Sequence, residues 1–170
     1  MTCRDCDKGW TRDMRYGDDG DTCFKLFPSP ATAGMAREFC LSNGAILPFI
    51  KDEAENNFVA NFVSELNKDV WLGYKKNSRM EWKFEENEVD FFNWKAGQPN
   101  NWMGDQNCAF MYGERESDGK CGDENCFSEF PFVCQKPMTS IHAGTGLESL
   151  GLHCLNWPIT IQNVKLEFAS

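Results

Sequence analysis

The chain has 170 residues, of which 41% are hydrophobic and 14% aromatic, enough to build one ordinary domain with a tail but not two full domains. Its formal net charge of -9 argues against nucleic acid and against an anionic membrane surface as partners, because both would repel it. The chain contains no run of about 18 apolar residues, so the sequence predicts no membrane span.

Nine cysteines are the most informative feature of the composition. Secreted domains pair cysteines as disulfides, whereas cytosolic proteins keep them reduced. Zinc is the competing interpretation, but only Cys3 and Cys6 have C-x2-C spacing, and both histidines, His142 and His153, lie in the tail. The spacing therefore favours disulfides and an extracellular protein. Because nine is odd, at least one cysteine is unpaired or bridges to another chain.

The first residues carry no secretion signal of their own. Met1 to Asp5 lack the basic and apolar regions of a signal peptide. We therefore expect a mature segment or fragment of a longer protein, either secreted or the ectodomain of a membrane-anchored protein. Residues 1–22 are polar, with a turn-rich stretch at 17–21, and the alternation of residues 23–27 predicts a strand.

Two helices are expected next. Ser29 as N-cap and Pro30 in the first turn predict a helix that ends at Asn43-Gly44. Its apolar face is formed by Met35, Phe39 and Cys40. After a short strand at residues 45–50, interrupted by Pro48, Asp52 is expected to cap a second helix. The apolar residues of that helix repeat at helical spacing: Ala54, Phe58, Phe62 and Leu66.

From Val70 onward the pattern is typical of strands and loops. Apolar runs predict strands at residues 70–74, 82–84, 91–92, 108–112 and 130–134. Between them lie polar loops at 95–106 and 114–123. Two early helices followed by many short strands indicate an α+β architecture.

The tail, residues 137–170, differs in kind. Gly and Ser recur up to Gly151, and residues 159–161 and 164–168 then alternate like a hairpin. The tail is either a flexible extension or the truncated start of a neighbouring domain, to which Cys154 would belong. The sequence thus divides into an N-terminal extension at 1–5, a domain at 6–136 and this tail.

Six short motifs occur in order along the domain. They are Cys6-x3-Trp10, Cys40-x3-Gly44-x2-Leu47-x2-Ile50, Val70-Trp71-Leu72-Gly73, Phe92-Asn93-Trp94, Gly97-Gln98-Pro99-Asn100-Asn101, and the closing Cys108, Cys126 and Cys134. Each motif alone is weak evidence of a family, but the ordered set resembles the long form of the C-type lectin family. The resemblance implies the C-type lectin fold: two helices, small antiparallel sheets and a long ligand loop, stapled by disulfides.

The resemblance also implies the cysteine pairs, which spacing alone does not fix. These are Cys6–Cys23, Cys40–Cys134 and Cys108–Cys126. Cys3, Cys121 and Cys154 are left over. Either one of them bridges two chains or a lone exposed thiol remains.

In sugar-binding members of the family, the ligand loop and a later strand hold a calcium ion, which two sugar hydroxyls then coordinate. The positions that would bind calcium here are Gln98, Asn100, Gln106, Gly122 and Asp123. Calcium takes six to eight hard oxygens and binds more tightly as carboxylates are added. Gln106 stands where a glutamate is expected, and Cys121-Gly122-Asp123 replaces the usual Trp-Asn-Asp. Asp123 is the only carboxylate of the set, so we expect calcium affinity of about millimolar or weaker.

Two further positions bear on calcium. Asp105 lies close enough in the sequence to substitute as a ligand, although no spacing supports it. A second calcium site is expected to be absent, because its neighbourhood is occupied by Lys75, Lys76, Asn101 and Asn107.

The predicted ligand-binding residues are Gln98, Asn100, Trp102, Gln106 and Asp123. Trp102 and nearby Tyr112 offer aromatic faces on which a sugar can stack, although Trp102 packing a small core of the loop is an equal alternative. The predicted function is extracellular ligand recognition, of a glycan or glycoprotein with weak or absent calcium dependence, or of a protein. An enzyme is not expected, because no catalytic pairing of cysteine or serine with histidine is found within the domain.

Overall fold

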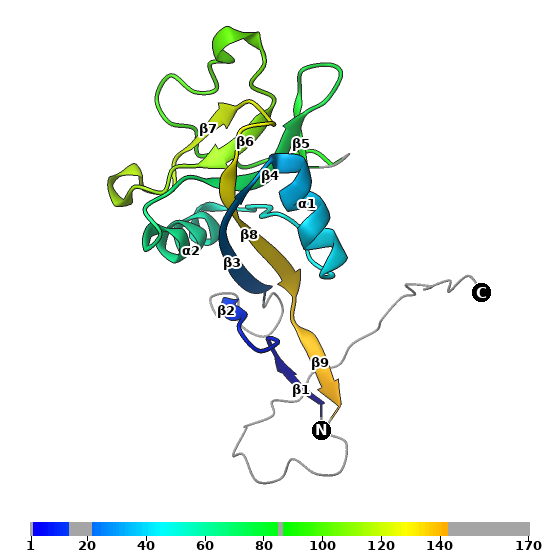
Figure 1. The fold of residues 1–170 in the computed structure, drawn as a ribbon. Coiled ribbons are helices and arrows are strands. Elements are labelled where there is room, and N and C mark those ends of the chain that lie inside the picture. Colours follow the sequence, from blue (N-terminus) through cyan, green and yellow to red (C-terminus); the bar gives the residue numbers. More distant parts are fainter. Residues whose placement is uncertain (1, 14–21, 85–86, 143–170) are drawn as a thin grey trace, which may run out of the picture. The chain divides into compact units, whose positions relative to one another are not determined.

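A computed structural model describes residues 2–13, 22–84 and 87–142 (Figure 1). Two compact units make up the chain, one of residues Cys6–Met138 and the other of Met1–Asp5 with Thr139–Ser170. The expected turn at 17–21, the expected hairpin at 159–168 and Cys154 lie outside the described residues. In the second unit, β1 (Thr2–Asp5) pairs antiparallel with β9 (Thr139–His142). Within the described ranges, no helix combines the length and apolar character needed to cross a bilayer.

One mixed sheet organises the larger unit. Its strands are β2 (Thr11–Asp13), β3 (Thr22–Ala31), β4 (Val70–Lys76), β5 (Trp82–Phe84), β6 (Cys108–Met111), β7 (Cys121–Glu124) and β8 (Phe130–Pro137). They follow the order β2-β3-β8-β4-β6-β7, with β5 paired to β4. All pairs are antiparallel except β4 with β8, which run parallel where Trp71 meets Phe132. Figure 1 shows β5, β6 and β7 together at one end and β2 at the other. The α+β prediction is confirmed.

Helix α1 (Ala33–Ser42) begins later than its sequence predicts. Its N-cap is Thr32, whose side chain accepts a hydrogen bond from the Met35 N–H at 3.3 Å. The prediction of Ser29 as N-cap is wrong, because Ser29 continues β3. A residue that precedes proline is biased away from helical backbone, and Ser29 precedes Pro30. The buried face is also different from the expected one: Ala33, Ala36 and Cys40 are buried, whereas Met35 and Phe39 are exposed.

Helix α2 (Glu53–Ser64) begins where it was predicted. The Asp52 side chain accepts a hydrogen bond from the Glu55 N–H at 2.9 Å, which confirms the N-cap. The most buried row of side chains on the helix lies one position later in the sequence than the expected apolar row. It consists of Glu55, Val59 and Val63, whereas Phe58 and Phe62 are partly buried and Ala54 is exposed. A pattern based on apolar residues misses a row that contains a buried glutamate.

Three expected segments differ from the prediction. Residues 45–50 form no strand, and only Ile46 bridges to Gln135, because Pro48 has no N–H to donate to a ladder. Residues 91–92 form no strand either, and the pairing occurs further along the chain, where Trp94 bridges to Cys121. The loop expected at 114–123 contains a short 3-10 helix and ends at Cys121, where β7 begins.

Three disulfides join distant parts of the domain, with the pairing that the family resemblance implied. They are Cys6–Cys23, Cys40–Cys134 and Cys108–Cys126, with Cα separations of 5.7, 5.5 and 5.2 Å. Cys40–Cys134 connects α1 to β8 and closes a sequence separation of 94 residues. Cross-linking so long a loop stabilises the folded state by about 4–5 kcal/mol in the chain-entropy model. Cys108–Cys126 connects β6 to the turn after β7, beside the candidate site.

Candidate functional site

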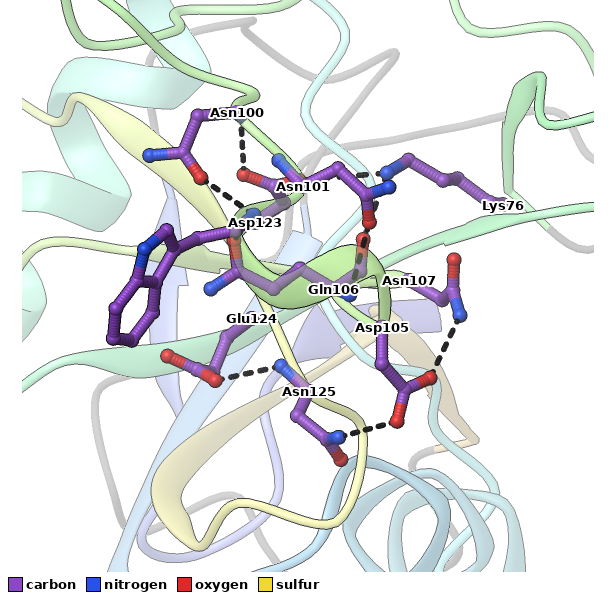
Figure 2. A network of polar contacts seen from close by, with 10 residues as sticks. Lys76, Asn100, Asn101, Asp105, Gln106, Asn107, Asp123, Glu124 and Asn125 are labelled. Carbon is purple, nitrogen blue, oxygen red and sulfur yellow. Dashed lines mark hydrogen bonds and ion pairs between the residues drawn. The ribbon is translucent and has the colours of Figure 1, made fainter.

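Asp123 anchors residues 97–107, the loop that contains the predicted ligand motif Gly97-Gln98-Pro99-Asn100-Asn101, to strand β7. Its buried carboxylate accepts two backbone hydrogen bonds from the loop, from the Asn100 N–H to Oδ1 and from the Asn101 N–H to Oδ2, both at 2.8 Å (Figure 2). Strand β7 is in turn fixed by its pairing with β6, where Asp123 lies opposite Ala109. The position of the loop backbone therefore depends on one carboxylate held by the sheet.

Lys76, the last residue of β4, brings a positive charge to the same carboxylate. Its Nζ lies 3.4 Å from Asp123 Oδ2 and donates to the Gln106 carbonyl oxygen at 2.8 Å. The ammonium also lies 4.9 Å from the centre of the Trp82 ring, within the range of a cation–π interaction. The Lys76 backbone N–H donates to the Asn107 carbonyl at 2.9 Å, so the lysine is fixed at its main chain as well.

The other predicted ligand oxygens are mostly engaged inside the loop. Asn100 Oδ1 and Gln106 Oε1 both accept from the Trp102 N–H, at 2.9 and 2.6 Å. Asn101 Oδ1 accepts from the Gln106 N–H at 3.1 Å. Gln98 differs, because its amide donates to the Tyr112 hydroxyl at 3.4 Å while its Oε1 is buried with no hydrogen-bond partner among the described residues.

These contacts allow a direct test of the fit to calcium. Calcium takes about six to eight oxygen ligands, preferably with several carboxylates. Of the four predicted ligand side chains, only Gln98 has an oxygen that no donor among the described residues engages. Asp105, the candidate substitute, accepts hydrogen bonds from the Asn107 and Asn125 side chains. Over the described ranges, no three His, Cys, Asp or Glu side chains are grouped to hold a metal.

The loop exposes two large apolar side chains. Trp102 is 70% exposed and Met103 is 85% exposed, in a short 3-10 helix at Trp102–Gly104. Trp102 therefore packs no core of the loop, which was the alternative to a ligand contact. Tyr112 is less open, because Lys95 Nζ lies 4.1 Å from the centre of its ring and Phe110 meets it edge-on.

A second turn, after β7, is tied to this loop. Asp105 Oδ2 accepts a hydrogen bond from the Asn125 side chain at 2.7 Å, and the Asn125 N–H donates to Glu124 Oε1 at 2.7 Å (Figure 2). Asn125 Oδ1 accepts from the N–H of Phe127, whose side chain is 83% exposed. The loop and this turn thus form one connected rim.

Cys121 is the first residue of β7, the strand that carries Asp123. Its thiol is free and buried in the main core cluster, against which Trp82 and Trp94 pack. Burial raises the pKa of the Cys121 thiol to about 12, so it remains protonated. The prediction that Cys121 is a candidate for an interchain disulfide is therefore wrong, because a buried thiol does not reach a second chain.

One residue of the site was not singled out from the sequence. Lys76 was noted only as one of the side chains that occupy the neighbourhood of a second calcium site. Its contact with Asp123 joins residues 47 positions apart. The available signal was a cation at the end of a buried strand, and nothing in that signal identifies its partner.

The family described as Lectin C-type domain matches residues 29–136 of this chain. C-type lectin lectoxin-Enh4 from Pseudoferania polylepis is 32% identical over 120 residues, covering 66% of this chain and 75% of that protein. The carbohydrate-recognition domain of the mouse scavenger receptor C-type lectin superposes with a TM-score of 0.66 at 26% identity, over 78% of this chain and 98% of that one. A calcium-independent type II antifreeze protein shares the fold, with a TM-score of 0.67 at 23% identity, over 81% and 98%. This chain belongs to the C-type lectin domain family.

Proposed function

We propose that this domain recognises an extracellular ligand without calcium, through the rim formed by residues 97–107 and the turn after β7. The observation that carries the proposal is the state of Asp123. Its carboxylate is already satisfied by two loop N–H groups and one ammonium. A calcium ion would have to displace these donors and would gain few carboxylates in return. The calcium-independent type II antifreeze protein is a precedent for this fold without the metal.

The proposed ligand is a glycan or glycoprotein. Exposed indole faces stack on the apolar faces of sugar rings, and Trp102 presents such a face at the rim. The neighbouring Asn100 is exposed and carries an amide that can donate to a sugar hydroxyl. A ligand bound in this way needs no metal bridge, so its affinity would be indifferent to a chelator.

A protein ligand is the second candidate, and a different observation favours it. Met103 is 85% exposed and Phe127 is 83% exposed, although both are apolar. Methionine and aromatic side chains are enriched at protein interfaces. A partner protein would cover both side chains, whereas a small sugar on Trp102 would leave Phe127 exposed.

The proposed setting is extracellular, and the proposed activity is binding rather than catalysis. Three disulfides support an oxidising compartment, because the cytosol keeps such thiols reduced. Asp123, the most buried acid of the site, uses both carboxylate oxygens to accept hydrogen bonds from the loop backbone. These hydrogen bonds support a role for Asp123 as a structural anchor rather than as a general acid or base.

Calcium titration tests the proposal first. The oxidised full chain is titrated with calcium by calorimetry, and its melting temperature is compared in calcium and in EDTA. We expect no micromolar binding and the same melting temperature in both. Micromolar binding with a raised melting temperature would contradict the proposal.

A glycan array probed in EDTA then tests the ligand class. Wild type is compared with Trp102→Ala and with Met35→Ala, an exposed apolar side chain on α1 that serves as the matched control. Binding in EDTA that is lost in W102A and kept in M35A supports glycan recognition. If no glycan binds, the protein-binding alternative takes its place.

A further inference from the structure

We infer that the ammonium of Lys76 is the resident cation of the ligand loop, replacing a bound metal as the charge that holds the loop on the sheet. Lys76 is then a positioning residue. It orients Asp123, and Asp123 holds the backbone of Asn100 and Asn101. The link to ligand binding rests on the proposed function, but the effect on the loop itself does not.

Burial is the first argument. The Asp123 side chain is 0% exposed and the Lys76 side chain is 8% exposed. A buried carboxylate without a countercharge is strongly unfavourable, and two hydrogen bonds from neutral amides leave that charge uncompensated. Among the described residues, Lys76 is the cation that forms an ion pair with Asp123.

The geometry of the ammonium is the second argument. Lys76 Nζ contacts one oxygen of the loop, the Gln106 carbonyl, and one oxygen of β7, Asp123 Oδ2 (Figure 2). A single cation that joins a loop carbonyl to a strand carboxylate occupies the role that a divalent ion plays in an oxygen site. The Trp82 ring lies beside the same ammonium and adds an electrostatic contact without a hydrogen bond.

The strand context supplies a matched control. Successive side chains of a strand point to opposite faces, so Lys75 and Lys76 diverge. Lys75 is exposed, whereas Lys76 is directed into the network. The same substitution at the two positions therefore removes the same charge, once from an exposed site and once from the network that joins Asp123 to the loop.

The test is native-state hydrogen exchange of the oxidised full chain, without ligand, for wild type, Lys76→Met and Lys75→Met. In K76M we expect the Asn100 and Asn101 amides to exchange at least about tenfold faster, with the amides of β8 unchanged. In K75M all these rates stay at their wild-type values. Equal rates at Asn100 and Asn101 in K76M and wild type, or an equal acceleration in K75M, would overturn the inference.

A double variant covers the case in which K76M fails to fold. In the double variant, Lys76→Met with Asp123→Asn, a neutral amide replaces the carboxylate that would otherwise lack a countercharge. This variant is therefore expected to fold and to melt higher than K76M. If the double variant melts no higher than K76M, neutralising residue 123 brings no gain, so an unpaired charge is not what destabilises K76M and the inference is wrong. A negative glycan array leaves all these results untouched, so failure of the proposed function is distinguishable from failure of this inference.

Discussion

The two ends of the domain are each stabilised by a different kind of interaction. Around α1, β3 and β8, buried apolar side chains and the Cys40–Cys134 disulfide hold the elements together. At the ligand loop, backbone N–H groups, one carboxylate and one ammonium do so, while the largest apolar side chains point outward. Apolar packing spreads its free energy over many contacts, whereas the loop depends on a few polar ones. We therefore expect mutations at the first end to lower global stability and mutations at the second end to loosen the loop locally.

The largest effect is expected from the long-range disulfide. Replacing Cys40 and Cys134 by alanine removes a cross-link between residues 94 positions apart and should lower the free energy of unfolding by about 4–5 kcal/mol. Replacing Cys108 and Cys126, whose separation is 18, should cost about 3 kcal/mol. Urea denaturation of both variants measures the difference. An equal loss in the two variants would show that loop length does not govern their stability.

Asp123→Ala should have the next largest effect. It leaves the Lys76 ammonium without its countercharge and two loop N–H groups without an acceptor, at an expected cost of about 3 kcal/mol. Asp105→Ala is the control, because this acid of the same loop is exposed. Native-state hydrogen exchange of the Asn100 and Asn101 amides compares the two variants, and a D105A loss as large as that of D123A would contradict the special role of the buried acid.

A smaller effect separates the two candidate caps of α1. Thr32→Ala removes the side-chain acceptor of the Met35 N–H and should cost about 1 kcal/mol. Ser29→Ala, at the position that the sequence favoured, should leave the free energy of unfolding nearly unchanged, because Ser29 lies in β3. Urea denaturation decides between them, and a loss confined to S29A would restore the original cap.

The smallest effect concerns Glu55, the buried acid of α2. Burial raises the pKa of its carboxyl above the ordinary value of 4.5. The folded state therefore binds its proton more tightly than the unfolded state does. The stability contributed by this proton is fully present below pH 4.5 and is lost as the pH rises through the folded-state pKa. Glu55→Gln should flatten the decline in stability from pH 4.5 to neutral.

Urea denaturation at several pH values measures this decline. Glu53→Gln is the matched control, since Glu53 is exposed in the first turn of the same helix. Equal pH profiles for wild type and E55Q would show that Glu55 does not titrate differently on folding.

The sequence by itself determined the family, the α+β class and the Asp52 cap of α2, because these depend on motif order and local hydrogen bonding. It also indicated that the calcium ligands are depleted, since that depends only on which residue types are present. The family resemblance, and not the spacing, supplied the disulfide pairing. Each of these signals is contained in short stretches of chain or in their order.

Only the tertiary structure decided how the site is held and what it exposes. It turned Trp102 outward, buried Cys121 and brought the Lys76 ammonium to 3.4 Å from the Asp123 carboxylate. The physical reason is distance along the chain. The end of β4 and the middle of β7 meet only when β6 pairs with both, and charge alone does not select one acid among the 26 that the sequence contains.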